Sequence, residues 1–411
     1  MKLFFFTNSY PYGFPDNWKT IELDEFSRHY EDIKIFPFSD GGSPGIKIDL
    51  PRKIQVLSPM LRSRDFVHAI RIFVRTIFSG LPAYFLREFF DAKVYTSLQR
   101  FELWFRSSYY TAAIYFHPEL KKLLTQSDPG TTWYFYWGSN MALVIPLIRK
   151  RVQHIFCRVH NSDLYENASN GYLPYQRRIL SNADLILPCS EDGKHYLETR
   201  FSSEISNIHV ARLGVLLQQQ RIKVNNHLPF KIVSCAFLFP TKRIRLLAEA
   251  LQYLDFPVHW THIGTGDDLD ELVDYCKQFT NSNIQVQFTG YMKHDDIIPF
   301  YLAGNFQLFV NVSSVEGIPV SIMEAMSVGI PTIATAVGGT GELVDESVGM
   351  LISPSLSAAE IATKIAAFHN LSITTRNSLS LSSIEKIAIY YDGKTNARKL
   401  LEQFMAAMKL G

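Results

Sequence analysis

The sequence predicts an α/β protein built from two doubly wound domains, each with a parallel sheet. Short, continuously apolar runs of strand length alternate along the chain with segments of helical period, as expected for strands buried on both faces. The alternation lapses between Gly214 and Pro229, where the chain is polar and aperiodic, and a new apolar run begins at Lys231. We therefore expect one domain over 1–215, another over 216–390, and a ligand site in a cleft between two such domains.

The predicted elements follow this alternation in both halves of the chain. In the first half the expected strands are KLFFFT, TWYFYWG, HIFCRVH and DLILPCS, and the helical EDGKHYLETRF follows the last of them. In the second half KIVSCAF precedes PTKRIRLLAEALQYL, HWTHIG precedes DDLDELVDYCKQF, and FQLFVNV precedes IPVSIMEAM before PTIAT and a Gly-rich turn. Strand and helix in regular succession indicate parallel βα units.

Composition excludes several classes of protein. The 411 residues carry 41 Lys and Arg against 39 Asp and Glu, a net charge of +2 that argues against a nucleic-acid partner. The four cysteines are far apart and form no CxxC pair, so we expect structural thiols in a reducing compartment. No secretory signal or spanning helix is expected, which favours a cytoplasmic protein.

The segment 51–122 is basic and aromatic and differs from the rest of the chain. Arg, Lys, Phe, Tyr and Trp are interleaved there with few acids. Two interpretations stay open: a helical insertion whose aromatic face packs on its own domain, which is favoured, or a peripheral contact with an anionic membrane at its inner face.

The most informative stretch, from Phe306 to Gly349, contains two acids around a helix start. A strand is expected to end at Val312, and Glu316 leads into a helix with Pro319 in its first turn. The amides and dipole of such a helix form an anion site. Glu324 follows eight residues later, about 12 Å along a helix axis. We therefore expect Glu316 at the entrance of the site and Glu324 two helical turns further in. This pattern suits a nucleoside diphosphate sugar, whose hydroxyls a carboxylate accepts well.

These residues resemble a known family. SSVEGIPVSIMEAMSVGIPTIATAVGG closely resembles the donor-binding signature of the family 4 retaining glycosyltransferases, which have the two-domain GT-B fold. SCAFLFPTKRIRLLAEAL, RVHNSDLYENASNGYLPYQRRIL and TNSYPYG are similar to further family segments, in the order seen in capsule, exopolysaccharide and colanic-acid enzymes. Only 51–122 lacks a counterpart, and the resemblance implies that a helix over 391–411 returns to the first domain.

The resemblance implies roles for residues of the second domain. Glu324 would bind the ribose, and Glu316 would hold the transferred sugar and stabilise its developing positive charge. Amides of Gly317, Ile318 and Val320 would assist Glu316. Pro319 has no N–H to give.

Further donor contacts are implied by the neighbouring loops. Lys242 and Arg243 would neutralise the diphosphate, with Arg243 substituting for the family's usual Arg at the position of Phe237. Gly290 and Tyr291 would lie beside the base.

In the first domain the resemblance points to the end of one strand and to one loop. His160 and Asp163 are the expected catalytic residues, with Asp163 orienting the imidazole or an acceptor hydroxyl. Arg158 shares the strand face of His160 and is expected to line the cleft. Gly13 would let backbone approach the diphosphate or acceptor.

Other motifs are weak. Asp268-Leu-Asp270 resembles a metal-binding DxD but stands where a helix cap is expected, Gly264-Thr-Gly266 begins an incomplete dinucleotide motif, and no histidine spacing indicates zinc. We expect no metal and no cofactor.

The sequence thus predicts a metal-independent retaining glycosyltransferase. Its donor would be a UDP- or GDP-sugar, and its acceptor a glycan or lipid-linked glycan of surface polysaccharide synthesis. The alternatives are a phosphorylase or hydrolysing epimerase of the same fold, and a catalytically idle sugar-nucleotide sensor or assembly partner.

Overall fold

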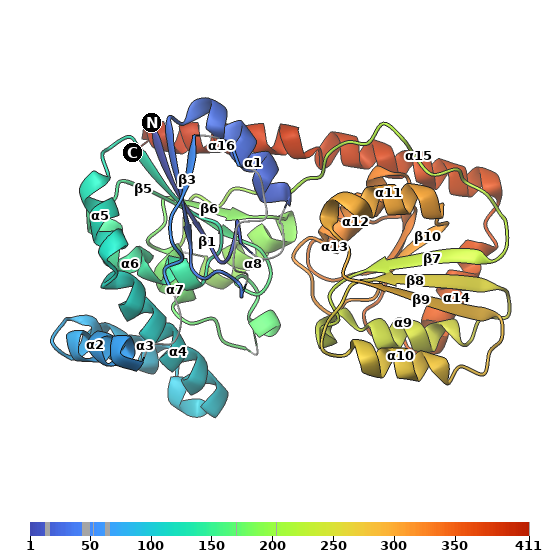
Figure 1. Cartoon of the computed structure of the whole chain (residues 1–411), viewed down its shortest axis with the longest axis horizontal. Helices are drawn as coiled ribbons and strands as arrows, with labels where there is room; N and C mark the ends of the chain where they lie inside the picture. Colours follow the sequence, from blue (N-terminus) through green and yellow to red (C-terminus); the bar gives the residue numbers. More distant parts are fainter. Residues whose placement is uncertain are drawn as a thin grey trace. The chain divides into compact units, whose positions relative to one another are not determined.

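The computed structural model describes residues 1–12, 17–42, 50–51, 53–61, 66–169, 171–202 and 204–410. The chain forms two compact units (Figure 1): unit 1 comprises Met1–Ala211 with Ala397–Gly411, and unit 2 comprises Arg212–Asn396. Each unit contains a parallel six-stranded sheet, so the predicted fold class is confirmed.

The sheet of unit 1 has the order β3-β2-β1-β4-β5-β6, and the direction in which strands are added reverses between β1 and β4. Its strands are β1 (Lys2–Thr7), β2 (Asp32–Pro37), β3 (Ile54–Val56), β4 (Thr131–Phe135), β5 (His154–Val159) and β6 (Leu185–Pro188). The helices are α1 (Asn17–His29), α2 (Phe66–Ile77), α3 (Leu81–Asp91), α4 (Leu98–Tyr115), α5 (Pro118–Gln126), α6 (Ile145–Ile148), α7 (Gln176–Leu180) and α8 (Glu191–Phe201), and most of α16 (Gly393–Leu410) also belongs to this unit.

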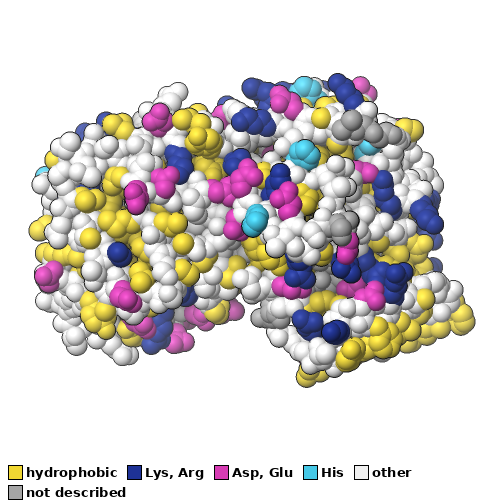
Figure 2. Space-filling model, turned by 180° about the vertical axis from the view of Figure 1, so that it is seen from behind, with side chains coloured by type: hydrophobic (Ala, Val, Ile, Leu, Met, Phe, Trp, Pro, Cys, Tyr) yellow, Lys and Arg dark blue, Asp and Glu magenta, His cyan; other side chains and the backbone are white. Residues whose placement is uncertain are grey.

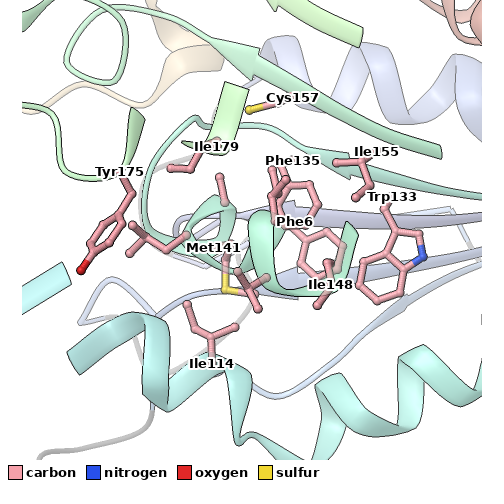
Figure 3. Close-up of a cluster of buried hydrophobic side chains, with 14 of the residues drawn as sticks. Phe6, Ile114, Trp133, Phe135, Met141, Ile148, Ile155, Cys157, Tyr175 and Ile179 are labelled. Carbon is pink, nitrogen blue, oxygen red and sulfur yellow. The ribbon is translucent and has the colours of Figure 1, made fainter. Parts of the chain in front are cut away.

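Both faces of this sheet are buried, which explains why its strands read as unbroken apolar runs. Successive side chains of β1 alternate between two cores. Phe4 and Phe6 pack with Trp133 and Phe135 beneath α4 to α7, the cluster shown in Figure 3. Leu3 and Phe5 pack on the other face with residues of α1 and α16.

The sheet of unit 2 has the order β12-β11-β10-β7-β8-β9 and again reverses direction, between β7 and β10. Its strands are β7 (Phe230–Cys235), β8 (Val258–Ile263), β9 (Ile284–Gly290), β10 (Leu308–Asn311), β11 (Thr332–Thr335) and β12 (Gly349–Ile352). Helices α9 (Ile244–Leu251), α10 (Leu269–Lys277) and α14 (Ala358–His369) cover one face in Figure 1, and α11 (His294–Gly304), α12 (Val320–Ser327) and α15 (Ile373–Tyr390) the other; the short α13 (Thr340–Leu343) follows β11.

Two segments have more structure than the sequence pattern indicates. The polar stretch 214–229 is part of unit 2, where Ile222 is buried and its amide donates to the Val328 carbonyl at 2.9 Å. The segment 51–122 is not wholly a helical insertion, because Ile54–Val56 forms the edge strand β3 paired with β2. Helices α2 to α4 make up the inserted part.

Across the ranges that the structure describes, no single helix is long and apolar enough to cross a membrane, although Ala69–Ile77 and Leu81–Asp91, bent by 88°, pass together by length and composition.

Candidate functional site

The two predicted acids lie on the segment that follows β10. Glu316 and Glu324 are both buried, at 6% and 4% exposure. Helix α12 begins at Val320, with Pro319 as its N-cap residue. Glu316 therefore belongs to the loop before the helix, and Glu324 lies one turn into α12. The expectation of an acid two turns in was wrong, because it counted the loop as helix.

Glu316 forms an ion pair with the predicted cation Lys242. The Lys242 ammonium donates to Glu316 Oε1 at 2.6 Å, and the Asn311 amide donates to the same oxygen at 3.3 Å. The Lys242 side chain keeps 24% exposure while that of Glu316 keeps 7%, so the pair lies at the edge of the protein interior. The Ser314 amide donates to the Thr241 carbonyl at 2.7 Å, which ties the two loops together.

Arg243 does not have the freedom that a diphosphate clamp requires. Its guanidinium donates to the carbonyl oxygens of Val312 at 2.6 Å, Pro354 at 2.6 Å and Ser313 at 3.3 Å. Its backbone has a φ of 50°, in the left-handed region, which turns the side chain back toward the ends of the strands. The prediction is corrected: Arg243 braces the loops that follow β10 and β12, and Lys242 is the cation of this pair with a solvent-facing side chain.

Glu324 is paired with a residue that the sequence analysis did not select. His294 Nε2 lies 2.5 Å from Glu324 Oε1, and both side chains are largely buried, at 24% and 6% exposure. His294 is the first residue of α11 and follows the carboxyl end of β9. A helix start soon after a parallel strand was the available signal, although it marks no particular residue.

The other predicted donor-contact residues lie just before or at the starts of α11 and α12. Gly290 ends β9 with a φ of 68°, and Tyr291 after it is 44% exposed. Val320 is the first residue of α12, so its amide belongs to the orphan donors of the helix start. Gly317 and Ile318 complete the loop after Glu316, and the Gly317 carbonyl accepts from the Gly339 amide at 2.7 Å.

Close backbone packing fixes the Glu316 loop. Gly338 has a φ of 49°, and a Cβ placed on it would lie 1.9 Å from the Glu316 carbonyl oxygen. Only glycine fits both the conformation and the contact. The backbone that carries Glu316 is therefore held against the loop that precedes α13.

The Cys235 thiol and the buried Tyr301 phenol lie near Glu324. Burial, with a further contribution from the Glu324 carboxylate, raises the pKa of Cys235 to about 12, while Lys242 opposes the shift. Burial also raises the pKa of Tyr301 well above its ordinary value. Both groups therefore stay neutral.

In unit 1, His160 follows β5 and lies in an aromatic cage. Its ring centroid is 4.2 Å from that of Trp137 and 5.0 Å from that of Tyr136. Both ring nitrogens are buried without a hydrogen-bond partner among the described residues. Burial disfavours the imidazolium, but the neighbouring Cys189 and Asp163 outweigh burial and raise the pKa of His160. Polar atoms buried in this way indicate a site that a ligand hydroxyl can complete.

Asp163 shapes the loop that carries His160. Its Oδ1 accepts from the His160 amide at 2.9 Å and the Asn161 amide at 3.2 Å, and its Oδ2 accepts from the Gly138 amide at 2.8 Å. Oδ2 is 3.9 Å from His160 Nδ1, so its influence on the imidazole is electrostatic.

Arg158 does not line a cleft. Its side chain is fully buried in an ion pair with Glu22 and also donates to the Ala211 carbonyl at 2.6 Å and the Tyr134 hydroxyl at 3.3 Å. The prediction from strand alternation was wrong because this face of β5 is covered by α1. Gly13 lies outside the described residues.

Within the described part of the chain, no cluster of three or more His, Cys, Asp or Glu residues is arranged to hold an ion. A cavity of about 640 Å³ in unit 1 is lined by basic and acidic side chains from α3, α4, α7 and α8. Two of its arginines are ion-paired, Arg178 with Glu88 and Asp91, and Arg200 with Glu166, so a salt-bridge network lines its wall.

The fold and the site define a class of protein. Two parallel-sheet units of this kind constitute the GT-B fold, and the chain is similar to Anabaena HepE, solved in complex with UDP, with a TM-score of 0.68 at 15% identity over 99% of this chain and 100% of that one. The GT-B fold implied by the resemblance is confirmed.

The second comparison concerns sequence families. Residues 218–382, which contain Lys242, His294, Glu316 and Glu324, match the family described as Glycosyl transferases group 1. This part of the chain is therefore a glycosyl transferases group 1 domain, and the predicted resemblance is confirmed there.

Curated relatives agree with this assignment. WcaL of Salmonella typhimurium, named for colanic acid biosynthesis, is 24% identical over 62% of this chain and 64% of its own length. The amylovoran biosynthesis glycosyltransferase AmsK of Erwinia amylovora is 27% identical over 45% of this chain and 47% of its own. The chain thus spans less than two thirds of the length of the relatives it matches.

Proposed function

We propose that the protein is a metal-independent, retaining glycosyltransferase of surface polysaccharide synthesis. It would move a sugar from a nucleoside diphosphate sugar to a hydroxyl of a glycan or lipid-linked glycan. The observation that carries the proposal is the arrangement at the carboxyl end of β10, where Glu316 pairs with Lys242 and Glu324 with His294 inside the matched domain.

The proposed roles follow from charge and position. Lys242 lies at the edge of the interior, so its ammonium can leave Glu316 and pair with a diphosphate while it stays in contact with solvent. The backbone amides at the start of α12, which have no partner within the helix, can donate to the same diphosphate. Glu316 is then released to face the sugar, where a carboxylate stabilises positive charge as the diphosphate departs. The departing oxygen would take the acceptor proton on the same face, so configuration is retained and no enzyme nucleophile is needed.

Glu324 is proposed to bind the ribose hydroxyls. It is held by His294 at 2.5 Å, and a carboxylate has acceptor capacity for two further hydroxyls. We propose uridine as the base, since HepE, which has this fold, is solved with UDP. Gly290 and Tyr291 would lie beside that base.

For unit 1 the proposal concerns one side chain. His160, whose ring nitrogens are buried without a partner among the described residues, is proposed to bind a hydroxyl of the sugar or the acceptor. Asp163 would position the loop that holds it. The proposal also includes a peripheral contact with an anionic membrane, where a lipid-linked acceptor would be met.

A ligand-stabilisation panel tests the proposal. UDP-, GDP- and ADP-sugars are added and the unfolding temperature is measured, because a ligand bound only by the native state adds about 2.7 kcal/mol at 100 times its dissociation constant. We expect a UDP-sugar to raise the unfolding temperature. Stabilisation by none of the three donors would refute donor binding.

Product analysis separates the alternatives. Transfer should need an acceptor and no inorganic phosphate, and the anomeric signal of the product in NMR should match that of the donor sugar. Turnover that depends on phosphate would identify a phosphorylase, and release of an altered free sugar would identify an epimerase. Glu316→Gln should retain donor binding and lose about 10²–10³ in kcat.

A further inference from the structure

Exposed apolar side chains are concentrated in the helical insertion of unit 1. Of the 24 large hydrophobic side chains that are exposed in the described residues, 11 lie between Ile70 and Phe105. Soluble monomers rarely keep so contiguous an apolar area in water, and larger exposed areas mark interaction sites. These 11 residues form the surface that we name the apolar face: Ile70, Phe73, Val74, Ile77, Phe78, Leu86, Phe90, Tyr95, Leu98, Phe101 and Phe105.

The exposed side chains of the apolar face recur with the period of an α-helix. On α2 the exposed residues Ile70, Phe73, Val74 and Ile77 follow the spacing i, i+3, i+4, i+7 and so form one stripe. Ile72 lies on the other side of the helix, is 4% exposed, and packs in the core of unit 1. Intramolecular packing therefore accounts for the inner side of α2 and leaves the stripe uncovered.

The next two helices extend the same surface. On α3, Leu86 and Phe90 are exposed four residues apart, while Leu81 and Phe85 enter the core. On α4, Leu98, Phe101 and Phe105 repeat at i, i+3, i+7. Figure 2 shows hydrophobic side chains gathered over this insertion, at the lower right, with Lys and Arg beside them.

Charge distinguishes between the possible occupants of the apolar face. Residues 66–106 contain six Lys and Arg against three Asp and Glu, and one of the acids, Glu88, is buried against Arg178. Arg71 and Arg75 are exposed on α2 itself, and Lys93 and Arg106 are exposed nearby. A second copy of the chain would bring the same positive excess against itself, whereas an anionic lipid surface neutralises it.

We propose that the apolar face inserts into the interfacial layer of an anionic bilayer. Helices α2 and α3 are bent by 88° and neither is long enough to span, so the insertion lies in the plane of the headgroups with its stripes toward the acyl chains. Arg71 and Arg75 contact lipid phosphates. The apolar contribution dominates, which separates this mode from binding by charge alone. The proposal deepens the membrane part of the proposed function and is independent of sugar transfer.

Vesicle flotation tests the proposal with the full chain. The wild-type protein is mixed with vesicles of phosphatidylcholine and phosphatidylglycerol, and with vesicles of phosphatidylcholine alone. We expect binding to the anionic vesicles that weakens but persists in about 0.5 M NaCl, where the screening length is about 4 Å. Phe73→Ser with Phe78→Ser should weaken the vesicle partition coefficient at least about 100-fold, since both rings are exposed, at 65% and 86%.

Matched variants control for folding and for general hydrophobicity. Phe101→Ser with Phe105→Ser, on α4, should also weaken binding, while Tyr253→Ser with Ile389→Ser, at exposed positions of unit 2, should not. Arg71→Gln with Arg75→Gln should lower binding at low salt only. UDP-sugar stabilisation, measured on each variant, should be unchanged, so a failure of donor binding is distinguishable from a failure of membrane binding.

Three outcomes would overturn the proposal. The first is a wild-type protein that does not float with anionic vesicles. The second is equal binding by the Phe73→Ser, Phe78→Ser variant. The third is a wild-type protein that associates without lipid and becomes monomeric in that variant, which would identify the apolar face as an interface between copies.

Discussion

Replacing Gly338 with Ala should displace the loop of Glu316. A Cβ at Gly338 would lie 1.9 Å from the Glu316 carbonyl oxygen, whereas real Cβ contacts do not fall below 3.0 Å. The loop must therefore move by about 1 Å, and a displacement of that size at a reacting group costs about 10²-fold in rate. We expect kcat to fall about 100-fold.

The same substitution should lower stability in two ways. Ala in the left-handed region costs about 1–2 kcal/mol. Moving the loop also weakens the hydrogen bond from the Gly339 amide to the Gly317 carbonyl, now 2.7 Å, which is worth about 1 kcal/mol. The free energy of unfolding, measured in urea, should fall by about 2–3 kcal/mol.

Gly42 provides the matched control. It has a φ of 75°, and no atom of the described residues lies within 4 Å of a Cβ placed on it. Gly42→Ala should therefore show the conformational cost alone, about 1–2 kcal/mol, with unchanged kcat. A Gly338→Ala protein with a rate within about threefold of wild type, or a stability equal to that of Gly42→Ala, would refute the reasoning.

Three further predictions concern buried polar groups. Glu324→Gln should weaken UDP-sugar binding about 10- to 150-fold in calorimetry, because hydrogen bonds to a charged group are worth about 1.5–3 kcal/mol. The control Glu271→Gln, in a surface ion pair of the same unit, should leave the affinity unchanged. Equal affinities of Glu324→Gln and wild type would exclude Glu324 as a ribose ligand. Arg158→Leu should cost about 3–5 kcal/mol in urea unfolding by leaving Glu22 buried and unpaired, and adding Glu22→Leu should recover most of the loss; a single variant within about 1 kcal/mol of wild type would show that the pair is dispensable. Burial lowers the pKa of His262 to about 4, so the unfolded state binds more protons than the folded state between about pH 6.5 and pH 4. The free energy of unfolding should therefore fall by about 3 kcal/mol as the pH falls through that window. His262→Gln should lack this part of the loss, and a pH dependence equal to that of wild type would contradict the prediction.

The fold could be predicted because burial on both sheet faces leaves a local signal. Runs such as KLFFFT need no knowledge of their partners to be identified as strands. The edge strand β3 was not predicted, because Ile54–Val56 is short and stands in a polar stretch. The depth of Glu324 in α12 was overestimated for a different reason, since the turns were counted from Glu316, which lies in the loop before Val320.

Residues of the candidate site could be predicted where the residue type alone indicated a role. They could not be predicted where the direction of the side chain, or a partner distant in the sequence, decided the role. Lys242 and Arg243 are adjacent cations, yet one pairs with Glu316 and the other turns toward three carbonyls, a difference set by the φ of Arg243. Arg158 was misplaced because its partner Glu22 is 136 residues away in the sequence. His294 was missed because a single histidine at a helix start has no spacing to mark it.

The carboxyl-terminal helix has a consequence for how the chain is made. Residues from Ala397 onward belong to unit 1, and Leu400, Leu401 and Phe404 complete the core between its sheet and α1. The ribosome therefore synthesises all of unit 2 before it synthesises the part of α16 that completes unit 1. Until then one face of the unit 1 sheet lacks part of its cover, and a chain truncated at residue 396 would never acquire it.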